Sequence, residues 1–105
     1  METSNEQPTC QTAMKVLGDF WTLRIIDFLK NDEVRFCELQ RNLDNINPAT
    51  LTKRLKALEE AQLVARSEET IDKVSVTYSL TELGKETLPV IKALSQFSKK
   101  ANAKL

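Results

Sequence analysis

The sequence of 105 residues contains no histidine, two cysteines, two glycines and three prolines, and it has no long hydrophobic run. Without histidine, a glycine-rich phosphate loop or a nucleophile beside an evident base, an enzyme is not expected. Two cysteines are too few for a structural zinc site with four ligands, so neither a metal nor a cofactor is expected. The absence of eighteen consecutive apolar residues, and of basic and apolar signal regions at the start, predicts a cytoplasmic protein with no membrane partner.

An excess of basic residues is also missing, because fifteen Lys and Arg balance fifteen Asp and Glu. Net charge therefore does not indicate a nucleic-acid-binding protein, and any positive surface must be local. The length and the hydrophobic fraction of 41% suit one domain around one core. We expect this domain at residues 9–101, with a flexible N-terminal tail at 1–8 and a C-terminal tail at 102–105.

Residues 47–60 form the most informative segment and predict a helix with one apolar and one basic face. Asn47 suits the N-cap and Pro48 the first helical position, where its missing N–H has no intrahelical partner. The apolar face has leucines spaced by four and three residues, namely Leu51, Leu55 and Leu58. The basic face is open to two interpretations: a surface helix with solvated lysines, or a helix that lies against duplex DNA.

The surroundings of this helix favour the second interpretation. Residues 35–43 predict a short helix with inward-facing apolar side chains, and residues 44–47 predict a turn, which together give a helix-turn-helix. Residues 62–66 and 74–80 contain β-branched and aromatic residues in partial alternation around a polar segment, 67–73, and predict a hairpin. A helix-turn-helix followed by a hairpin is a winged helix, so the expected fold is mainly α with a small β-hairpin.

Helical patterns flank this region, with expected boundaries at residues 10–17, 21–30, 82–88 and 89–101. Gly18 suits the C-terminal cap of the first helix, and Trp21 is expected in the core because it shares a face with isoleucine and leucine. Thr81 suits the N-cap of the last helix, which Pro89 is expected to interrupt. The apolar residues after Pro89 exceed what a small core needs, which suggests a partner.

Several landmarks occur in a characteristic order and spacing between residue 10 and about residue 97: Cys10, Gly18, Trp21, Arg35-Phe36, Glu38-Leu39, Leu51, Arg54-Leu55, Leu58-Glu59, Tyr78-Ser-Leu-Thr81 and Gly84. In these landmarks the sequence resembles the HxlR-type winged-helix transcriptional regulators, relatives of the MarR group. Two places depart from the family pattern. Gln11 follows the cysteine in place of proline, and Asp19-Phe20 replace a small and a basic residue, so a basic contact at Phe20 is lost.

By this resemblance, the chain is expected to be a homodimeric repressor whose two recognition helices bind an inverted-repeat operator in double-stranded DNA. The half-site centres are then expected about 34 to 36 Å apart, or at a multiple of that spacing. A monomer with an apolar C-terminal helix is the alternative. A small-molecule or oxidant inducer is compatible with the family, but the sequence does not identify one. The expected dimer interface comprises Met14, Leu88, Ile91, Leu94 and Phe97.

The candidate DNA contacts divide by the reach of their side chains. Base edges are assigned to short and medium side chains near the helix N-terminus: Ala49, Thr50 and Lys53. The other candidates, mostly phosphate contacts through side chains or the backbone, are Arg35, Asn47, Thr52, Arg54, Lys56, Arg66 and Lys73. Arg35 has an alternative role, which is to pair with Glu38 on its own helix. The polar segment of the wing has three acids against Lys73, so its tip is expected to lean away from DNA.

Cys10 suggests thiol-linked control, because a helix N-terminus favours the thiolate that oxidants and electrophiles attack. Some members of the family that the sequence resembles use this cysteine to sense oxidants or reactive carbonyls. An unreactive small residue near the dimer interface is the alternative, and Cys37 is expected to be half-buried. A second class of function also stays open, a winged-helix module that binds protein and not DNA, which the neutral charge and the acidic wing would suit.

Overall fold

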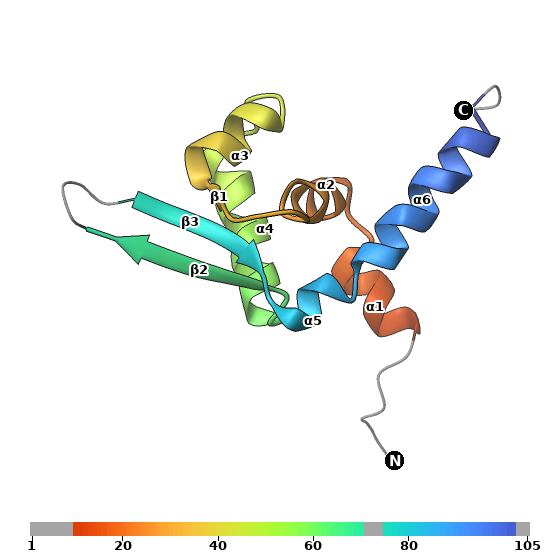
Figure 1. Ribbon diagram of the computed structural model, residues 1–105, viewed down its shortest axis with the longest axis horizontal. Helices are drawn as coiled ribbons and strands as arrows, with labels where there is room; N and C mark the ends of the chain where they lie inside the picture. Colours follow the sequence, from red (N-terminus) through yellow and green to blue (C-terminus); the bar gives the residue numbers. More distant parts are fainter. Residues whose placement is uncertain (1–9, 71–74, 103–105) are drawn as a thin grey trace, which may run out of the picture.

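Residues 10–70 and 75–102 are described by the computed structural model, and they form a mainly helical fold with one small sheet (Figure 1). In chain order the elements are α1 (Cys10–Leu17), α2 (Phe20–Phe28), β1 (Val34–Arg35), α3 (Phe36–Asn42), α4 (Pro48–Glu60), β2 (Val64–Glu69), β3 (Ser75–Leu80), α5 (Glu82–Lys85) and α6 (Leu88–Lys100). The helix-turn-helix consists of α3 and α4, and the wing consists of β2 and β3. The expected winged-helix fold is confirmed.

The core forms where α2, α3 and α4 bring their apolar faces together. Its largest fully buried side chains are Ile25, Ile26, Leu29, Leu39, Leu43, Leu51, Leu55 and Leu58. Each such side chain stabilises the fold by roughly 1.5–3 kcal/mol when it leaves water. Trp21 is partly buried and packs against this cluster, as expected of a core tryptophan.

The sheet has three antiparallel strands in the order β1-β3-β2. The sequence does not reveal β1, because two residues are too few for alternation to be recognised. β2 continues through Ser67, Glu68 and Glu69, whose polar character predicts a loop. These side chains are exposed, so the strand forms there through backbone pairing with β3 and leaves no hydrophobic pattern. Lys73, the candidate contact at the tip of the wing, lies outside the described residues.

α4 ends in a Schellman motif and does not lead directly into a strand at residue 62. The N–H of Gln62 donates to the carbonyl of Glu59 at 2.9 Å, and the N–H of Leu63 donates to that of Leu58 at 3.0 Å. Gln62 has a φ of 63°, the left-handed conformation that glycine usually takes at this position. The strand therefore begins two residues later than expected, at Val64.

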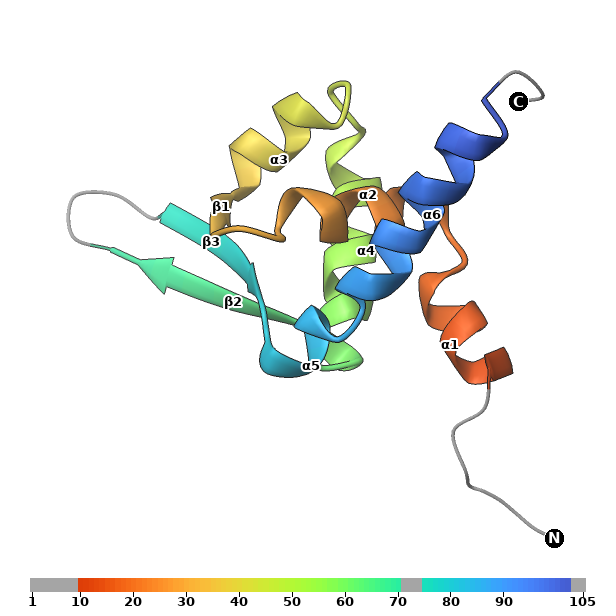
Figure 2. The same ribbon diagram turned by 45° about the vertical axis from the view of Figure 1, so that its right-hand side comes forward.

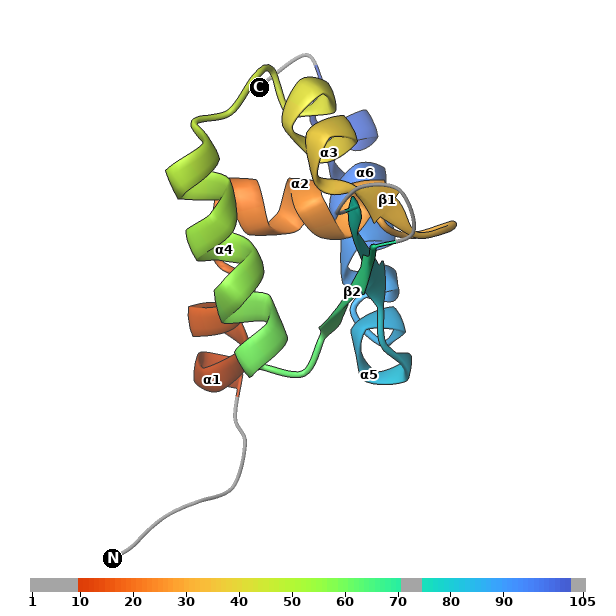
Figure 3. The same cartoon turned by 90° about the vertical axis from the view of Figure 1, so that its left-hand side faces the viewer.

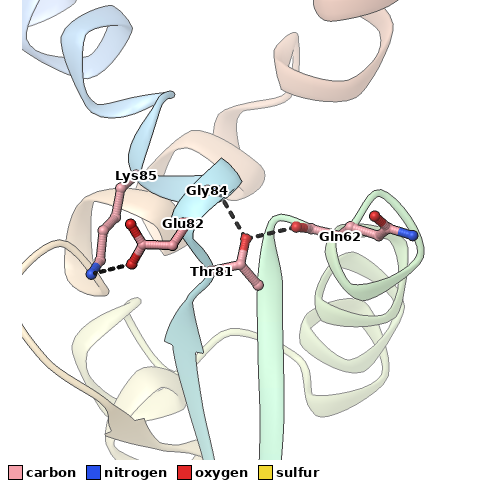
Figure 4. A network of polar contacts seen from close by, with 5 residues as sticks. All are labelled: Gln62, Thr81, Glu82, Gly84 and Lys85. Carbon is pink, nitrogen blue, oxygen red and sulfur yellow. Dashed lines mark hydrogen bonds and ion pairs between the residues drawn. The ribbon is translucent and has the colours of Figure 1, made fainter.

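Thr81 ties the end of β3 to the turn after α4 (Figure 4). Its hydroxyl donates to the carbonyl of Gln62 at 2.7 Å and accepts the N–H of Gly84 at 2.9 Å, which confirms Thr81 as the N-cap of α5. Gly84 lies close to the turn after α4, and a Cβ on Gly84 would collide with the carbonyl oxygen of Leu63. The contacts of Thr81 and Gly84 therefore hold the wing, α4 and α5 in place relative to one another.

The junction between α1 and α2 differs from the expected arrangement. α2 starts one residue earlier, at Phe20, because Asp19 is its N-cap and accepts the N–H of Thr22 at 2.9 Å. It also ends two residues before the expected boundary. Gly18 does not adopt the positive φ of a left-handed cap. Glycine is required there because a Cβ would collide with the carbonyl oxygen of Met14.

The C-terminal helix breaks before Pro89 and not at it. α5 ends at Lys85 and α6 begins at Leu88, so Pro89 lies in the first turn of α6. A proline is tolerated there because the N–H that it lacks would have no helical partner. The break includes Thr87, whose buried hydroxyl donates to the carbonyl of Gly84 at 2.6 Å.

α1 and α6 lie on the opposite side of the molecule from the wing, and α6 projects away from the core (Figures 1 and 2). The first turn of α6 packs on the core through Leu88 and Ile91, whereas its later turns are exposed. Across the two described stretches of chain, every helix is too short or too polar to cross a bilayer.

Candidate nucleic-acid interface

The N-terminus of α4 is held by the cap that its sequence predicts. Asn47 Oδ1 accepts the N–H of Ala49 at 2.8 Å and that of Thr50 at 3.4 Å, and Pro48 occupies the first turn of the helix. A phosphate that binds the backbone at this end has to compete with the cap for the same N–H groups. The expected backbone contact behind Asn47 is therefore weaker than a free helix end would provide.

The turn before α4 is held by interactions that the sequence does not reveal. Asp44 and Asn45 have φ values of 60° and 55°, a left-handed conformation that Asp and Asn tolerate better than most residues. Arg24 of α2 pairs with the Asp44 carboxylate at 2.9 Å, and Gln40 Nε2 donates to the carbonyl of Ile46 at 3.1 Å. The adjacent Asp and Asn are a local turn signal, but no local pattern points to Arg24.

Four exposed side chains lie along one face of α4, and we call them the recognition stripe: Ala49, Thr52, Lys53 and Lys56. Their spacing is that of helical neighbours, and they point away from the buried leucines. Neither lysine pairs with a carboxylate of residues 10–70 or 75–102. Thr50 is half-buried beside the stripe, and its predicted contact with a base stays a prediction. Figure 3 shows α4 along one flank of the molecule.

Arg54 lies off the recognition stripe and forms an ion pair with another residue of its own chain. Its Nε is 3.0 Å from Oδ2 of Asp19, an ion pair in which both side chains are about one-third exposed. Partial burial raises the pKa of Asp19, but hydrogen bonds from Thr22 and the charge of Arg54 outweigh this effect and hold the pKa below its usual value. The phosphate contact predicted for Arg54 stays a prediction, and a phosphate would have to compete with Asp19 for its guanidinium.

A groove between α3, α4 and the sheet contains two further cations. Its lining includes Arg35, Cys37, Thr52, Arg66 and Tyr78. Arg66 donates to Glu68 Oε1 at 3.2 Å. The pKa of Arg66 is raised, first by its hydrogen bond with Tyr78 and then by Glu68, so its guanidinium stays charged. The part of the chain that the structure describes has no group of three potential metal ligands, in this groove or elsewhere.

Arg35 precedes α3 with an exposed side chain. Glu38 accepts the backbone N–H of Arg35 at 3.2 Å, and the described residues show no ion pair between its carboxylate and the Arg35 guanidinium. The Arg35 side chain is therefore open to another partner. Cys37 is exposed and not half-buried as expected, because its helical position faces away from buried Leu39.

The wing adds little positive charge to this surface. Glu68 and Glu69 are exposed on β2, and the charge of Arg66 at the base of the wing is offset by Glu68. In the described part of the chain, the positive surface next to α4 is therefore carried mainly by Arg35, Lys53 and Lys56. This arrangement is how a chain of zero net charge can still present a local basic face.

Exposed apolar side chains lie on both terminal helices, and together we call them the terminal apolar surface: Met14 of α1 and Val90, Leu94 and Phe97 of α6. Met14 and Phe97 are the most exposed of the four, at 67% and 60%. Leu88 and Ile91, which were expected at a dimer interface, are half-buried and pack against the core of their own chain. Cys10 is exposed at the first residue of α1.

Comparison with known sequences identifies relatives along most of the chain. The sequence model of the HxlR-like helix-turn-helix family matches residues 16–104. The uncharacterized HTH-type transcriptional regulator YvaP of Bacillus subtilis is 32% identical over 98 residues, which cover 93% of this chain and 91% of YvaP. The HTH-type transcriptional regulator YodB of the same organism is 35% identical over 77 residues, which cover 73% of this chain and 69% of YodB.

Solved structures that are similar to this chain are also described as regulators. A transcriptional regulator described as of the MarR family, from Porphyromonas gingivalis, is 29% identical with a TM-score of 0.83, covering 94% of this chain and 97% of its own. The redox regulator HypR in its reduced form is 25% identical with a TM-score of 0.83, covering 89% and 92%. Quinone-bound YodB is 28% identical with a TM-score of 0.76, covering 90% and 99%.

Replacing Asn47 with alanine should lower the free energy of unfolding by about 1 kcal/mol, because two N–H groups of α4 lose their acceptor. Asn47→Asp keeps an oxygen at the same place and should unfold at nearly the urea concentration of the unsubstituted protein. Urea denaturation followed by circular dichroism measures both variants. Equal midpoints for Asn47→Ala and the unsubstituted protein would show that the cap does not stabilise α4.

Proposed function

This chain belongs to the HxlR-like helix-turn-helix family of transcriptional regulators, and we propose that it is a homodimeric repressor that binds an inverted-repeat operator in double-stranded DNA. Its relatives carry the names of regulators and not of enzymes. The observation that carries the proposal is the recognition stripe, an exposed and partly basic face of a capped helix within a winged helix-turn-helix. The repressor would act where genomic DNA lies, in the cytoplasm of a prokaryote such as those that carry its relatives.

The recognition stripe has side chains suited to the major groove. Lys53 can donate to the O6 and N7 atoms of guanine, Thr52 can bond to a base or a phosphate, and Ala49 can contact a thymine methyl group. Lys56 lies one turn further along α4 and suits a phosphate. Since neither lysine has a carboxylate partner among the described residues, binding DNA does not require an internal pair to break.

Two arginines in the groove beside Thr52 support binding to the DNA backbone. Arg35 is exposed without a described carboxylate partner, and Arg66 is oriented by Tyr78 and Glu68. Phosphate contacts of this kind add affinity and fix the orientation of the protein, but they do not distinguish sequences. Arg35 should contribute more than Arg66, because Glu68 offsets part of the Arg66 charge.

The terminal apolar surface supports the dimer. Its four side chains lie on α1 and α6, on the side of the molecule opposite the wing (Figure 2), so a second copy that covers them would leave the wing exposed. A two-fold dimer presents two recognition helices with the same spacing as the half-sites of an inverted repeat. Leu88 and Ile91 would contribute less to this interface than expected, because they pack on their own core.

Control by modification of the Cys10 thiol completes the proposal. Cys10 is exposed at the start of α1, the helix that also carries Met14 of the terminal apolar surface. HypR is described as a redox regulator and a YodB structure as quinone-bound, and thiolates react with both oxidants and quinones. A group attached to Cys10 would lie beside the dimer interface and could change the distance between the two recognition helices.

Selection of random duplex DNA by the purified, reduced protein should enrich an inverted repeat with half-site centres one helical turn, or a multiple of it, apart. Sequencing of the bound pool measures the outcome. A pool with no enriched motif, at low and at physiological salt, would contradict the operator proposal. It would favour a module that binds protein, for which the exposed acids of β2 are the suitable surface.

Introducing a charge into the terminal apolar surface should convert the dimer into a monomer. Leu94→Glu or Phe97→Glu would bury an unpaired carboxylate at the interface, whereas Gln96→Glu places the same charge at an exposed polar position of the same helix. Sedimentation equilibrium at micromolar concentrations should show monomers for the first two variants and dimers for the control. Dimers in all three variants would place the interface elsewhere.

Treatment with a benzoquinone should release the protein from its selected duplex through Cys10. The two cysteines are both exposed, so Cys37→Ser is a matched control for Cys10→Ser. Gel-shift titrations should show release for the unsubstituted protein and for Cys37→Ser, and retained binding for Cys10→Ser. Release that persists in Cys10→Ser, or no release in the unsubstituted protein, would refute control through this thiol.

A further inference from the structure

One carboxylate oxygen joins the start of α2 to the recognition helix. Oδ2 of Asp19 accepts the N–H of Thr22 at 2.9 Å and the Thr22 hydroxyl at 3.1 Å, and it lies 3.0 Å from Nε of Arg54. The first two contacts cap α2, and the third crosses to the middle of α4. Asp19 thus connects two helices that are far apart in the sequence.

The surroundings of this contact leave the Asp19 carboxylate as the counter-charge next to the Arg54 Nε. Nε of Arg54 is shielded from solvent and makes no well-aligned hydrogen bond with any described residue, so the nearby carboxylate is what offsets its charge. Thr22 is buried. Lys15 of α1 lines the same depression as Asp19 and Arg54. Removing the carboxylate would leave the shielded Nε of Arg54 without a counter-charge, with Lys15 in the same depression.

Asp19 is also fixed to the end of α1. Its N–H donates to the carbonyl of Leu17 at 2.8 Å, and the N–H of Gly18 donates to the carbonyl of Met14 at 2.7 Å. A Cβ at Gly18 would collide with the carbonyl oxygen of Met14, so the chain between the two helices packs closely against the end of α1. The backbone at Asp19 is therefore joined by hydrogen bonds to the end of α1 and to the start of α2.

We propose that Asp19 is a positioning residue for operator binding, which holds α4 in place through Arg54. The inference rests on the proposed function, since it assumes that the recognition stripe binds DNA. Arg54 then acts within the protein and does not bind phosphate. α1 carries Met14 and Cys10, so the Asp19–Arg54 pair, which we call the clamp, links the dimer side of the molecule to the DNA side.

The dependence of DNA affinity on salt separates the clamp from a phosphate contact. Each phosphate contact that is lost lowers the slope of log affinity against log salt by about 0.9. Asp19→Ser and Arg54→Met should each weaken binding of the selected duplex by about tenfold at every salt concentration, with no change in slope. The double variant should be no weaker than either single variant. Lys56→Met is the control and should lower the slope by about 0.9.

Serine at position 19 retains a hydroxyl that can cap α2, so Asp19→Ser removes the charge and keeps the cap. Asp19→Asn, which keeps the shape of the side chain, is the second variant if the first does not fold. Affinities are compared per folded molecule, at a temperature where circular dichroism shows every variant to be folded. A clamp that only stabilises the fold would lower the urea midpoint and leave this affinity unchanged, which would overturn the proposal.

Other results would overturn the clamp in different ways. A slope that falls in Arg54→Met as it does in Lys56→Met would make Arg54 a phosphate contact. Tighter binding by Asp19→Ser would show that a freed Arg54 gains a contact with DNA. These outcomes require that the unsubstituted protein binds a selected duplex. If the folded, dimeric protein binds no duplex, the proposed function is wrong. The clamp proposal is then overturned as well, because it assumes DNA binding.

Discussion

Burial of three leucines on one face of α4 determines which side chains this helix offers to solvent. Leu51, Leu55 and Leu58 are almost inaccessible. Turning α4 about its axis would expose them at a cost of roughly 1.5–3 kcal/mol for each side chain. The recognition stripe therefore points outward as a consequence of the core. The Asn47 cap fixes where the helix begins and the leucines fix which face is buried, whereas the proposed Asp19–Arg54 clamp acts on the position of α4.

Some elements of this fold could be predicted from local sequence signals, and others depend on contacts between residues far apart in the chain. α1 follows from the spacing of its apolar residues and α4 from spacing and capping signals, whereas the break expected at Pro89 lies before it, between Lys85 and Leu88. β1 has no such signal, because it is a strand only through pairing with β3 much later in the chain. Likewise, Arg24 meets Asp44 only after α2 and the turn have packed on the core. Contacts of this kind depend on the fold and not on a local pattern.

In the candidate site, the exposed cations of α4 could be predicted from the sequence, but the ion pairs of its arginines could not. Lys53 and Lys56 could be predicted as exposed cations, because the helical period places them away from the leucines. The pairing of Arg54 with Asp19 could not, so a count of cations on α4 overestimates the charge available to DNA. Arg66 is similarly offset by Glu68. Exposed charges are screened beyond about 10 Å in ordinary salt, so the acids of the wing act mainly on groups close to them.

α1 lies between the proposed dimer interface and the Asp19–Arg54 pair. A helix of eight residues is marginal by itself, so its position depends on what it contacts on either side. On one side it exposes Met14 to the proposed partner copy, and at its end it continues through Gly18 into Asp19. Under the proposed function, α1, Asp19 and Arg54 are therefore the contiguous contacts that join the dimer interface to the recognition helix.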